Sequence, residues 1–150
     1  RYHLPYRAAL NGRYRYFTDT WGIRAHTAEL AYIHPWAGKW IFEARYRYYT
    51  QDDADFYSDL FPYANSQNFL ARDKELSTFV SQTFGIGASY EFAGGCPRWV
   101  QKGTINLNFD FIRFDYENFR DIRVTGVTPG TEPLYSFDAN VIQLFVSVWF

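Results

Sequence analysis

The stretch Val141-Ile-Gln-Leu-Phe-Val-Ser-Val-Trp-Phe150 decides the fold, because apolar side chains occupy every second position of it. One face of an extended chain would carry Ile142, Leu144, Val146, Val148 and Phe150. The other face would carry the polar residues Gln143 and Ser147. A period of two residues is typical of a β-strand with one apolar and one polar side. The stretch therefore predicts a half-buried strand.

The same alternation recurs in earlier segments of the chain. It is clearest in Trp40–Tyr48, where aromatic residues and Ala44 alternate with Ile41 and charged residues. Alternation also predicts strands over Leu10–Thr18, over residues 28–32 around Leu30, over Leu76–Phe92 and from Ile105. With the last stretch, about six antiparallel strands are expected. The polar face of Leu76–Phe92 includes Gly85 and Gly87, which leave space for bulky neighbours or mark a bend.

Turn residues and irregular segments separate these strands. Short turns are predicted at 18–22, at 34–39 and at 93–98; Pro35 in the second cannot donate to a ladder, and Gly38 permits a positive φ. Two long segments, about 51–75 and 117–134, carry no alternation and are rich in polar residues, Pro or Gly. The long connections follow the third and fifth strands, so both would lie at the same end of an up-and-down sheet.

Composition limits the class of protein further. Aromatic residues make up 22% of the 150 residues, with 13 Tyr, 15 Phe and 5 Trp, which is far above an ordinary soluble domain. The formal net charge is -1, from 15 basic and 16 acidic residues, so there is no electrostatic case for nucleic acid as a partner. No run reaches the roughly 18 apolar residues of a transmembrane helix. No signal peptide is recognisable, and we expect a mature product or a fragment.

The final stretch resembles the C-terminal strand of a bacterial outer-membrane β-barrel. In that resemblance Leu144, Val146, Val148 and Phe150 correspond to the assembly signal that the barrel-assembly machinery reads. The segments Arg13–Gly22 and Arg45–Tyr57, with the repeated Arg-Tyr-Arg-Tyr block, resemble the C-terminal region of an outer-membrane family classed as a domain of unknown function. The resemblance implies a fold and a bacterial outer-membrane location, and it brings no catalytic residues.

The architecture expected from these observations is all-β: an antiparallel up-and-down transmembrane β-barrel. Residues 1–150 would be the C-terminal part of one barrel domain, because about six strands are fewer than the roughly eight of the smallest such barrels. The aromatic excess would form girdles at the two membrane interfaces. After Phe111 the alternation slips, which indicates a β-bulge near Ile112 or exit from the membrane. A soluble sheet or a small lipocalin-like barrel is the alternative, since alternation alone does not distinguish the two.

The polar positions of the strands should face the interior of such a barrel. The expected lumen-facing residues are Arg13, Arg15, Glu29, Glu43, Arg45, Arg47, Glu91, Asn106, Asn108 and Asp110. One interpretation makes them the lining of an aqueous pore or a selective constriction. The other makes them ion pairs between neighbouring strands that hold the register of a narrow interior.

No catalytic residue, metal site or cofactor is expected. Asp52, Asp53, Asp55 and Asp59 fail the spacing of a helix-loop-helix calcium site and are interpreted as a solvated loop. His26 and His34 would share the lipid-side face, where interfacial packing is the expected role. Cys96, between Gly95 and Pro97, is interpreted as a turn residue.

The expected function is a passive or loop-gated, porin-like pore in the outer membrane of a Gram-negative envelope. Its partners would be outer-membrane lipid and, during biogenesis, the barrel-assembly machinery. The alternative is a structural barrel that docks another envelope protein through its two long loops. An outer-membrane enzyme is the weakest hypothesis.

Overall fold

The computed structural model describes residues 1–61, 63, 68–93 and 101–150. Seven antiparallel strands form one sheet in which neighbours in sequence are neighbours in space. They are β1 (Tyr2–His3), β2 (Ala9–Thr18), β3 (Arg24–Trp36), β4 (Trp40–Gln51), β5 (Phe79–Ala93), β6 (Lys102–Arg120) and β7 (Leu134–Trp149). A short 3₁₀ helix, η1 (Lys74–Leu76), precedes β5. Within the described ranges, no helix has the length and apolar character needed to cross a membrane.

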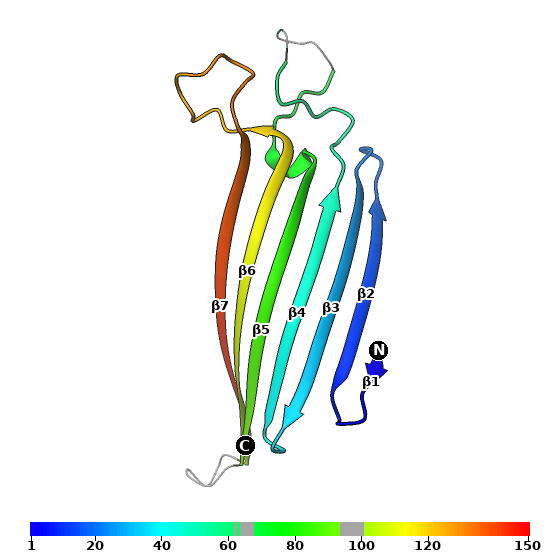
Figure 1. Ribbon diagram of the computed structural model, residues 1–150, viewed down its shortest axis with the longest axis vertical. Coiled ribbons are helices and arrows are strands. Elements are labelled where there is room, and N and C mark those ends of the chain that lie inside the picture. Colours follow the sequence, from blue (N-terminus) through cyan, green and yellow to red (C-terminus); the bar gives the residue numbers. More distant parts are fainter. Residues whose placement is uncertain (62, 64–67, 94–100) are drawn as a thin grey trace.

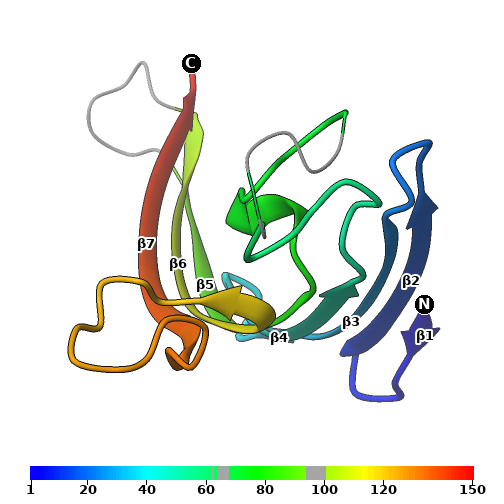
Figure 2. The same cartoon turned by 90° about the horizontal axis from the view of Figure 1, so that it is seen from above.

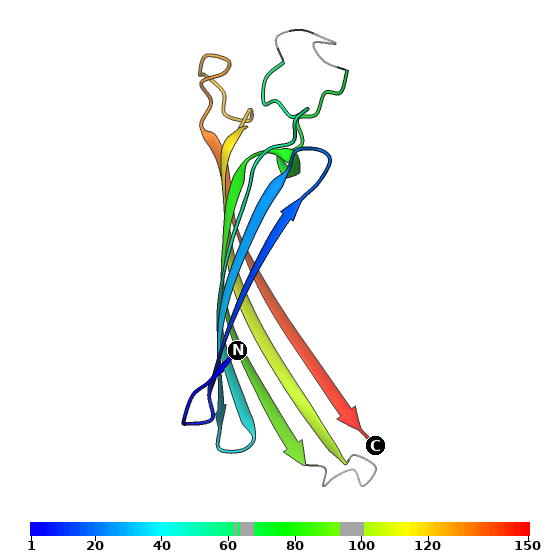
Figure 3. The same cartoon turned by 90° about the vertical axis from the view of Figure 1, so that its right-hand side faces the viewer.

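The sheet is long, strongly curved and not closed. Seen along the strands, it is a trough with β2 and β7 on opposite arms (Figure 2). The side view shows the strands crossing the long axis obliquely, as twisted antiparallel strands do (Figure 3). In the described part of the chain, β7 pairs with β6 alone, and β2 beyond Leu10 pairs with β3 alone. The predicted all-β, up-and-down fold is confirmed, and the open sheet is consistent with part of a barrel.

The alternation in the sequence gives the sheet two different faces. Directly paired residues share a face, and the register places Arg45, Gly85 and Asp110 in one row and Ala44, Ile86 and Phe109 in the next. The polar face is the concave one, because the Gln51 side chain on it contacts the segment that includes η1, and this segment lies inside the trough (Figure 2). The convex face is mainly apolar from the row of Phe84 and Phe111 down to the short-turn end.

Both long connections lie at the same end of the sheet, as predicted. Residues 52–78 and 121–133 join β4 to β5 and β6 to β7 at the upper end of Figure 1. The lower end has short connections, including the turn Ala37–Lys39, in which Ala37 and Gly38 have positive φ. The predicted asymmetry between the two ends is therefore confirmed for the described connections.

Some predicted strand boundaries were wrong. β1 was missed, because two residues carry no periodic signal. His34, Pro35 and Trp36 belong to β3 and not to a turn. Pro35 is tolerated there because the last β3 residue that pairs with β2 is Ile33, so its missing N–H costs no bond on that side.

The expected start of β5 was wrong, and so was one of the two explanations for the slip of alternation in β6, the β-bulge. The predicted strand began at Leu76, but Leu76 ends the 3₁₀ helix and β5 begins at Phe79, because Leu76 fits the alternation of the following strand only by chance. No β-bulge occurs near Ile112, which pairs in continuous register with Thr83 and Ala139. The register shift lies later, between Asp115 and Arg120. The alternation slips at Ile112 because aromatic and aliphatic side chains replace polar ones on the concave face.

Candidate functional site

The concave face collects the polar residues that the alternation predicts. The register places all of them on this one side of the sheet: Arg13, Arg15, Glu29, Glu43, Arg45, Arg47, Glu91, Asn106, Asn108 and Asp110. They lie at mid-height and toward the short-turn end. On β5 and β6 the same face becomes aromatic from the row of Arg15 upward, where the Phe79 ring contacts Phe114 and Tyr116.

The strongest polar contact on this face joins two strands that are not neighbours. Arg45 on β4 donates from Nε to Asp110 Oδ1 at 3.0 Å, and from Nη2 to Oδ1 and Oδ2 at 2.7 and 2.6 Å, although β5 runs between them. Arg45 also lies 3.6 Å from Glu43. Gly85 makes the crossing possible, because a Cβ there would lie 2.5 Å from Arg45 Nε and closer still to Asp110 Oδ1. The prediction that Gly85 leaves space for bulky neighbours is confirmed.

A second group of arginines on this face has no carboxylate partner among the described residues. Arg13, Glu29 and Arg47 form one row across β2, β3 and β4, and Arg15 lies in the row above. With Thr27 they line a recess of about 240 Å³, which we call the basic recess. Three guanidinium groups and one carboxylate give it a net positive charge.

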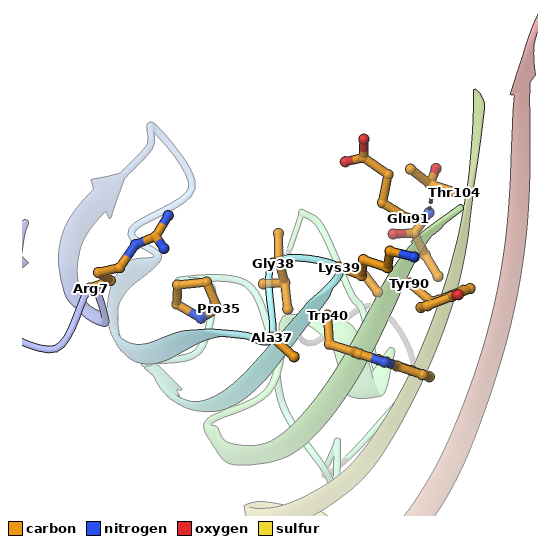
Figure 4. Close-up of a pocket in the computed structure, with 12 residues that line it drawn as sticks. Arg7, Pro35, Ala37, Gly38, Lys39, Trp40, Tyr90, Glu91 and Thr104 are labelled. Carbon is orange, nitrogen blue, oxygen red and sulfur yellow. Dashed lines mark hydrogen bonds between the residues drawn. The ribbon is translucent and has the colours of Figure 1, made fainter. Parts of the chain in front are cut away.

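A third feature lies at the short-turn end, where a recess of about 300 Å³ opens beside the Ala37–Lys39 turn (Figure 4). The backbone N–H of Glu91 donates to the Lys39 carbonyl at 2.8 Å, which fixes this turn to β5. In Figure 4 the Glu91 side chain points away from the side of the sheet that carries Trp40 and Tyr90, whose ring centroids are 4.6 Å apart. Glu91 therefore lies on the concave side.

The long connection after β4 folds into the trough and is anchored there. The Gln51 side chain donates to the carbonyls of Glu75 and Ser77, both at 2.9 Å, and accepts a bond from the Tyr49 hydroxyl at 2.7 Å. Farther along, Asn118 of β6 accepts from the Thr78 backbone at 2.8 Å and donates to Asp53 at 3.1 Å. These bonds connect the inward-folded loop to strands on both of its sides.

The Asp59 carboxylate is the centre of a second anchor, which we call the Asp59 latch. Arg72 Nη2 and Arg120 Nη1 donate to its two oxygens, each at 2.8 Å. The Asp59 side chain is only 7% exposed, and Arg72 lies with its guanidinium carbon 4.6 Å from the Phe119 ring centroid. The loop was expected to be solvated; for Asp59 this was wrong, because two arginines distant in sequence bury and neutralise it.

Tyr57 is a buried residue of the same loop. It packs with Ile23 and Ala54 in a small buried cluster, and its hydroxyl donates to the Asn118 carbonyl at 3.0 Å. The pKa of Tyr57 is raised to about 12, mainly by burial and in smaller part by the nearby Asp59 carboxylate. The phenol therefore stays protonated at neutral pH and keeps its hydrogen bond.

The convex face holds the residues that resemble an assembly signal. Leu144, Val146 and Val148 are 63%, 61% and 44% exposed on β7, and Phe150 follows the end of the strand. His26 and His34 also lie on this face, where their Nδ1 atoms are 2.6 and 3.0 Å from the hydroxyls of Tyr14 and Tyr32.

The acidic loop residues do not form a group that could hold a metal. Across the described ranges, no cluster of three or more His, Cys, Asp or Glu side chains has suitable geometry. Asp53 and Asp59 instead bind side chains of the protein itself. Cys96 and the turn predicted around it lie outside the described residues.

Sequence reasoning missed the residues that anchor the loop. Arg72, Asn118 and Arg120 come from segments without alternation or from the end of β6, and their partners are 13 to 65 positions away. The only signal in the sequence was the long irregular segment itself, which indicates a functional loop but does not say where it folds.

Residues 1–121 match the family described as "Protein of unknown function (DUF3570)". The chain belongs to this family. The match covers β1 to β6 and the inward-folded loop, and it ends before β7. The description of DUF3570 states no activity. No curated protein and no solved structure matches the chain significantly.

The crossing of Arg45 over Gly85 leads to a stability prediction. Gly85→Ala should lower the free energy of unfolding by about 1–3 kcal/mol, the usual cost of forcing an atom into a filled space. Gly12→Ala is the matched control, because a Cβ at Gly12 on β2 meets nothing within 4 Å. Urea unfolding of both variants measures the difference. Equal stability would contradict the proposed role of Gly85.

The Asp59 latch leads to a second prediction. Asp59→Asn removes the charge that two arginines share, at a cost of about 1–3 kcal/mol. Amide hydrogen exchange in residues 52–61 and 68–78 should then be about 5- to 100-fold faster, while exchange in β3 should not change. Asp115→Asn is the control, since it removes an equally charged but exposed partner of Arg113. Unchanged loop exchange in the Asp59 variant would show that the latch does not hold the loop.

Proposed function

We propose that this chain forms part of an outer-membrane β-barrel that acts as a passive or loop-gated pore. The observation that carries the proposal is the inward-folded loop, which lies over a polar concave face whose opposite side is apolar. A polar trough backed by an apolar wall is the arrangement of a water-filled lumen in a lipid bilayer. Strands of the same barrel beyond this segment would close the trough.

The convex face supports a position in lipid. Several of its aliphatic and aromatic side chains are more than 50% exposed: Leu30, Phe84, Ile86, Ile142, Leu144 and Val146. An exposed apolar surface of this extent is unusual for a soluble monomer. On β5 the apolar positions run from Phe84 to Phe92, about 26 Å along the strand at ~3.3 Å per residue. A transmembrane strand tilted by about 45° needs ~9–11 residues, and positions 84 to 92 of β5 supply that length.

The limits of this apolar region also support the proposal. Above Phe84 the convex face becomes polar in one row, formed by Gln82, Arg113 and Asp138 on three adjacent strands. Below it, Trp40 and Tyr90 pack together near the short-turn end. Amphipathic rings at one boundary and charges at the other are typical of membrane interfaces. We therefore propose that the short turns face the periplasm and the long loops the outside.

The inward-folded loop supports gating. It reaches into the trough from the end that would be extracellular, and the Asp59 latch and the Gln51 bonds hold it there. Because the loop narrows the lumen, the ionic conductance of the pore would be lower than the barrel diameter set by its strand number would allow. Movement of the loop would regulate entry.

A docking function is the second candidate, favoured by apolar side chains on the long loops. Among the described loop residues, six of them are more than 40% exposed: Leu60, Tyr63, Phe69, Leu70, Ile122 and Val127. The loops approach one another, since a Cβ at Gly130 would lie 3.2 Å from Leu60 Cδ1. Together they offer a surface to another envelope protein.

Single-channel recording of the full-length protein in a planar bilayer tests the pore. We expect stepwise conductance that increases with salt concentration. Asp59→Asn should lengthen the open events, because the loop loses its anchor, and Asp115→Asn should not. Absence of conductance from protein shown to be folded and inserted would exclude an open pore and favour the docking function.

The position of the convex face in lipid is tested by two adjacent substitutions. Leu144→Arg would place a charge on the apolar face and should cost about 2–4 kcal/mol of folding free energy in vesicles if this position is near the bilayer centre. Gln143→Arg is the matched control, because the same charge would then point to the concave side. Equal stability of the two variants, measured by urea unfolding in lipid vesicles, would contradict this orientation.

A further inference from the structure

We propose that the basic recess is the selectivity element of the pore and binds small oxyanions of the phosphate type. This inference rests on the proposed pore function and adds the class of solute to it. It is carried by Arg13, Arg15 and Arg47, which come from two strands and surround a single carboxylate, Glu29.

The charges of the basic recess are not neutralised within it. Among the described residues, no carboxylate lies within 4.0 Å of the side-chain nitrogens of Arg13, Arg15 or Arg47, even though Glu29 is paired directly with two of them in the register. The net charge of these four side chains is therefore about +2. A group of side chains with this charge favours binding of an anion.

Five other arginines of the structure are paired with a carboxylate. Arg45 binds Asp110, Arg72 and Arg120 bind Asp59, and the exposed arginines at 113 and 123 bind the aspartates two residues before or after them. Arg1, Arg7 and Arg24 have no carboxylate within 4.0 Å among the described residues, but they do not line a recess together, whereas Arg13, Arg15 and Arg47 do. The basic recess is where the concave face keeps a cluster of cationic side chains available to a solute.

Aromatic rings support two of the guanidinium groups without removing their charge. The guanidinium carbon of Arg15 lies 6.0 Å from the Phe17 ring centroid, and that of Arg47 lies 5.8 Å from the Tyr49 ring centroid. Both contacts are weak at this distance. They remove no charge, so the guanidinium groups that line the recess remain cationic.

The chemistry of guanidinium favours oxyanions. Its planar set of N–H donors matches two oxygens of a phosphate or carboxylate at once, which a spherical halide cannot use. Groups of arginine or lysine are also the usual lining of anion-selective and phosphate-selective pores. Phosphate, with more oxygens than a carboxylate, can engage all three arginines.

The basic recess lies on the path that the proposed gate would control. Tyr49, which contacts Arg47, donates its hydroxyl to Gln51, and Gln51 holds the carbonyls of Glu75 and Ser77 in the inward-folded loop. The recess therefore begins one row of side chains below the point where the loop is anchored. A solute that passes the loop meets these arginines next.

The test is ion selectivity of the full-length protein, measured as the reversal potential in a KCl gradient. The native pore should prefer chloride to potassium. Arg13→Gln/Arg15→Gln/Arg47→Gln should lower the permeability ratio by about threefold or more, since each charge acts at close range. Glu29→Gln removes the negative charge of the same recess and should raise the permeability ratio. Arg113→Gln, on the convex face, should leave it unchanged.

Inorganic phosphate is the probe for the ligand class. Added to a KCl solution at constant ionic strength, it should reduce chloride current through the native pore and not through the triple variant. A native pore that conducts without anion preference, or whose selectivity and phosphate block survive the triple substitution, would overturn this inference while the pore function stands. Absence of conductance from the native protein would overturn both.

Discussion

The structure depends on a shared register of antiparallel pairs from β2 to β7, which is continuous except for the shift between Asp115 and Arg120 at the upper end of β6. Because side chains alternate with a period of two, a slip of one residue in any pair would move the polar positions of a strand to the apolar side. The register avoids this: Arg13, Glu29, Arg47 and Thr83 follow one another across four strands in one row. The polar concave face and the apolar convex face exist only because the polar positions of every strand fall on the same side of the sheet.

Curvature adds a second requirement, because side chains on a concave face crowd one another. β5 meets it with small residues on that face: Ser81, Thr83, Gly85, Gly87 and Ser89. A Cβ at Gly87 would lie 2.6 Å from Asn108 Oδ1, so the space above β5 is already used by its neighbours. β5 therefore has small side chains on its concave side, and long polar side chains of β4 and β6, such as Arg45 and Asp110, meet across it.

The fold could be predicted from the sequence because its signal is local. Alternation in Trp40–Tyr48 and in the final stretch specifies strands and faces, and loop lengths specify which connections share an end. The loop contacts could not be predicted. Asp59 meets Arg72 and Arg120 only after the chain has folded into the trough, and nothing in the Asp-rich segment distinguishes a buried carboxylate from a solvated one. For the same reason, the sequence did not reveal that Arg45 is paired across β5 while Arg47, two residues later, lacks a carboxylate partner among the described residues.

The free edges of the sheet connect the two proposals. Within the described residues, Asn11 to Thr18 of β2 have no strand on their outer side, and in lipid their unpaired N–H and C=O groups would each cost several kcal/mol. If the sheet lies in lipid, as proposed, a barrel wall would continue beside β2. Arg13 and Arg15 lie on this strand, so the inward side chains of the adjoining strand would be the nearest new neighbours of the basic recess. Carboxylates there would neutralise it, whereas polar or basic residues would preserve it, and the sign of the measured selectivity reports which of these the complete barrel contains.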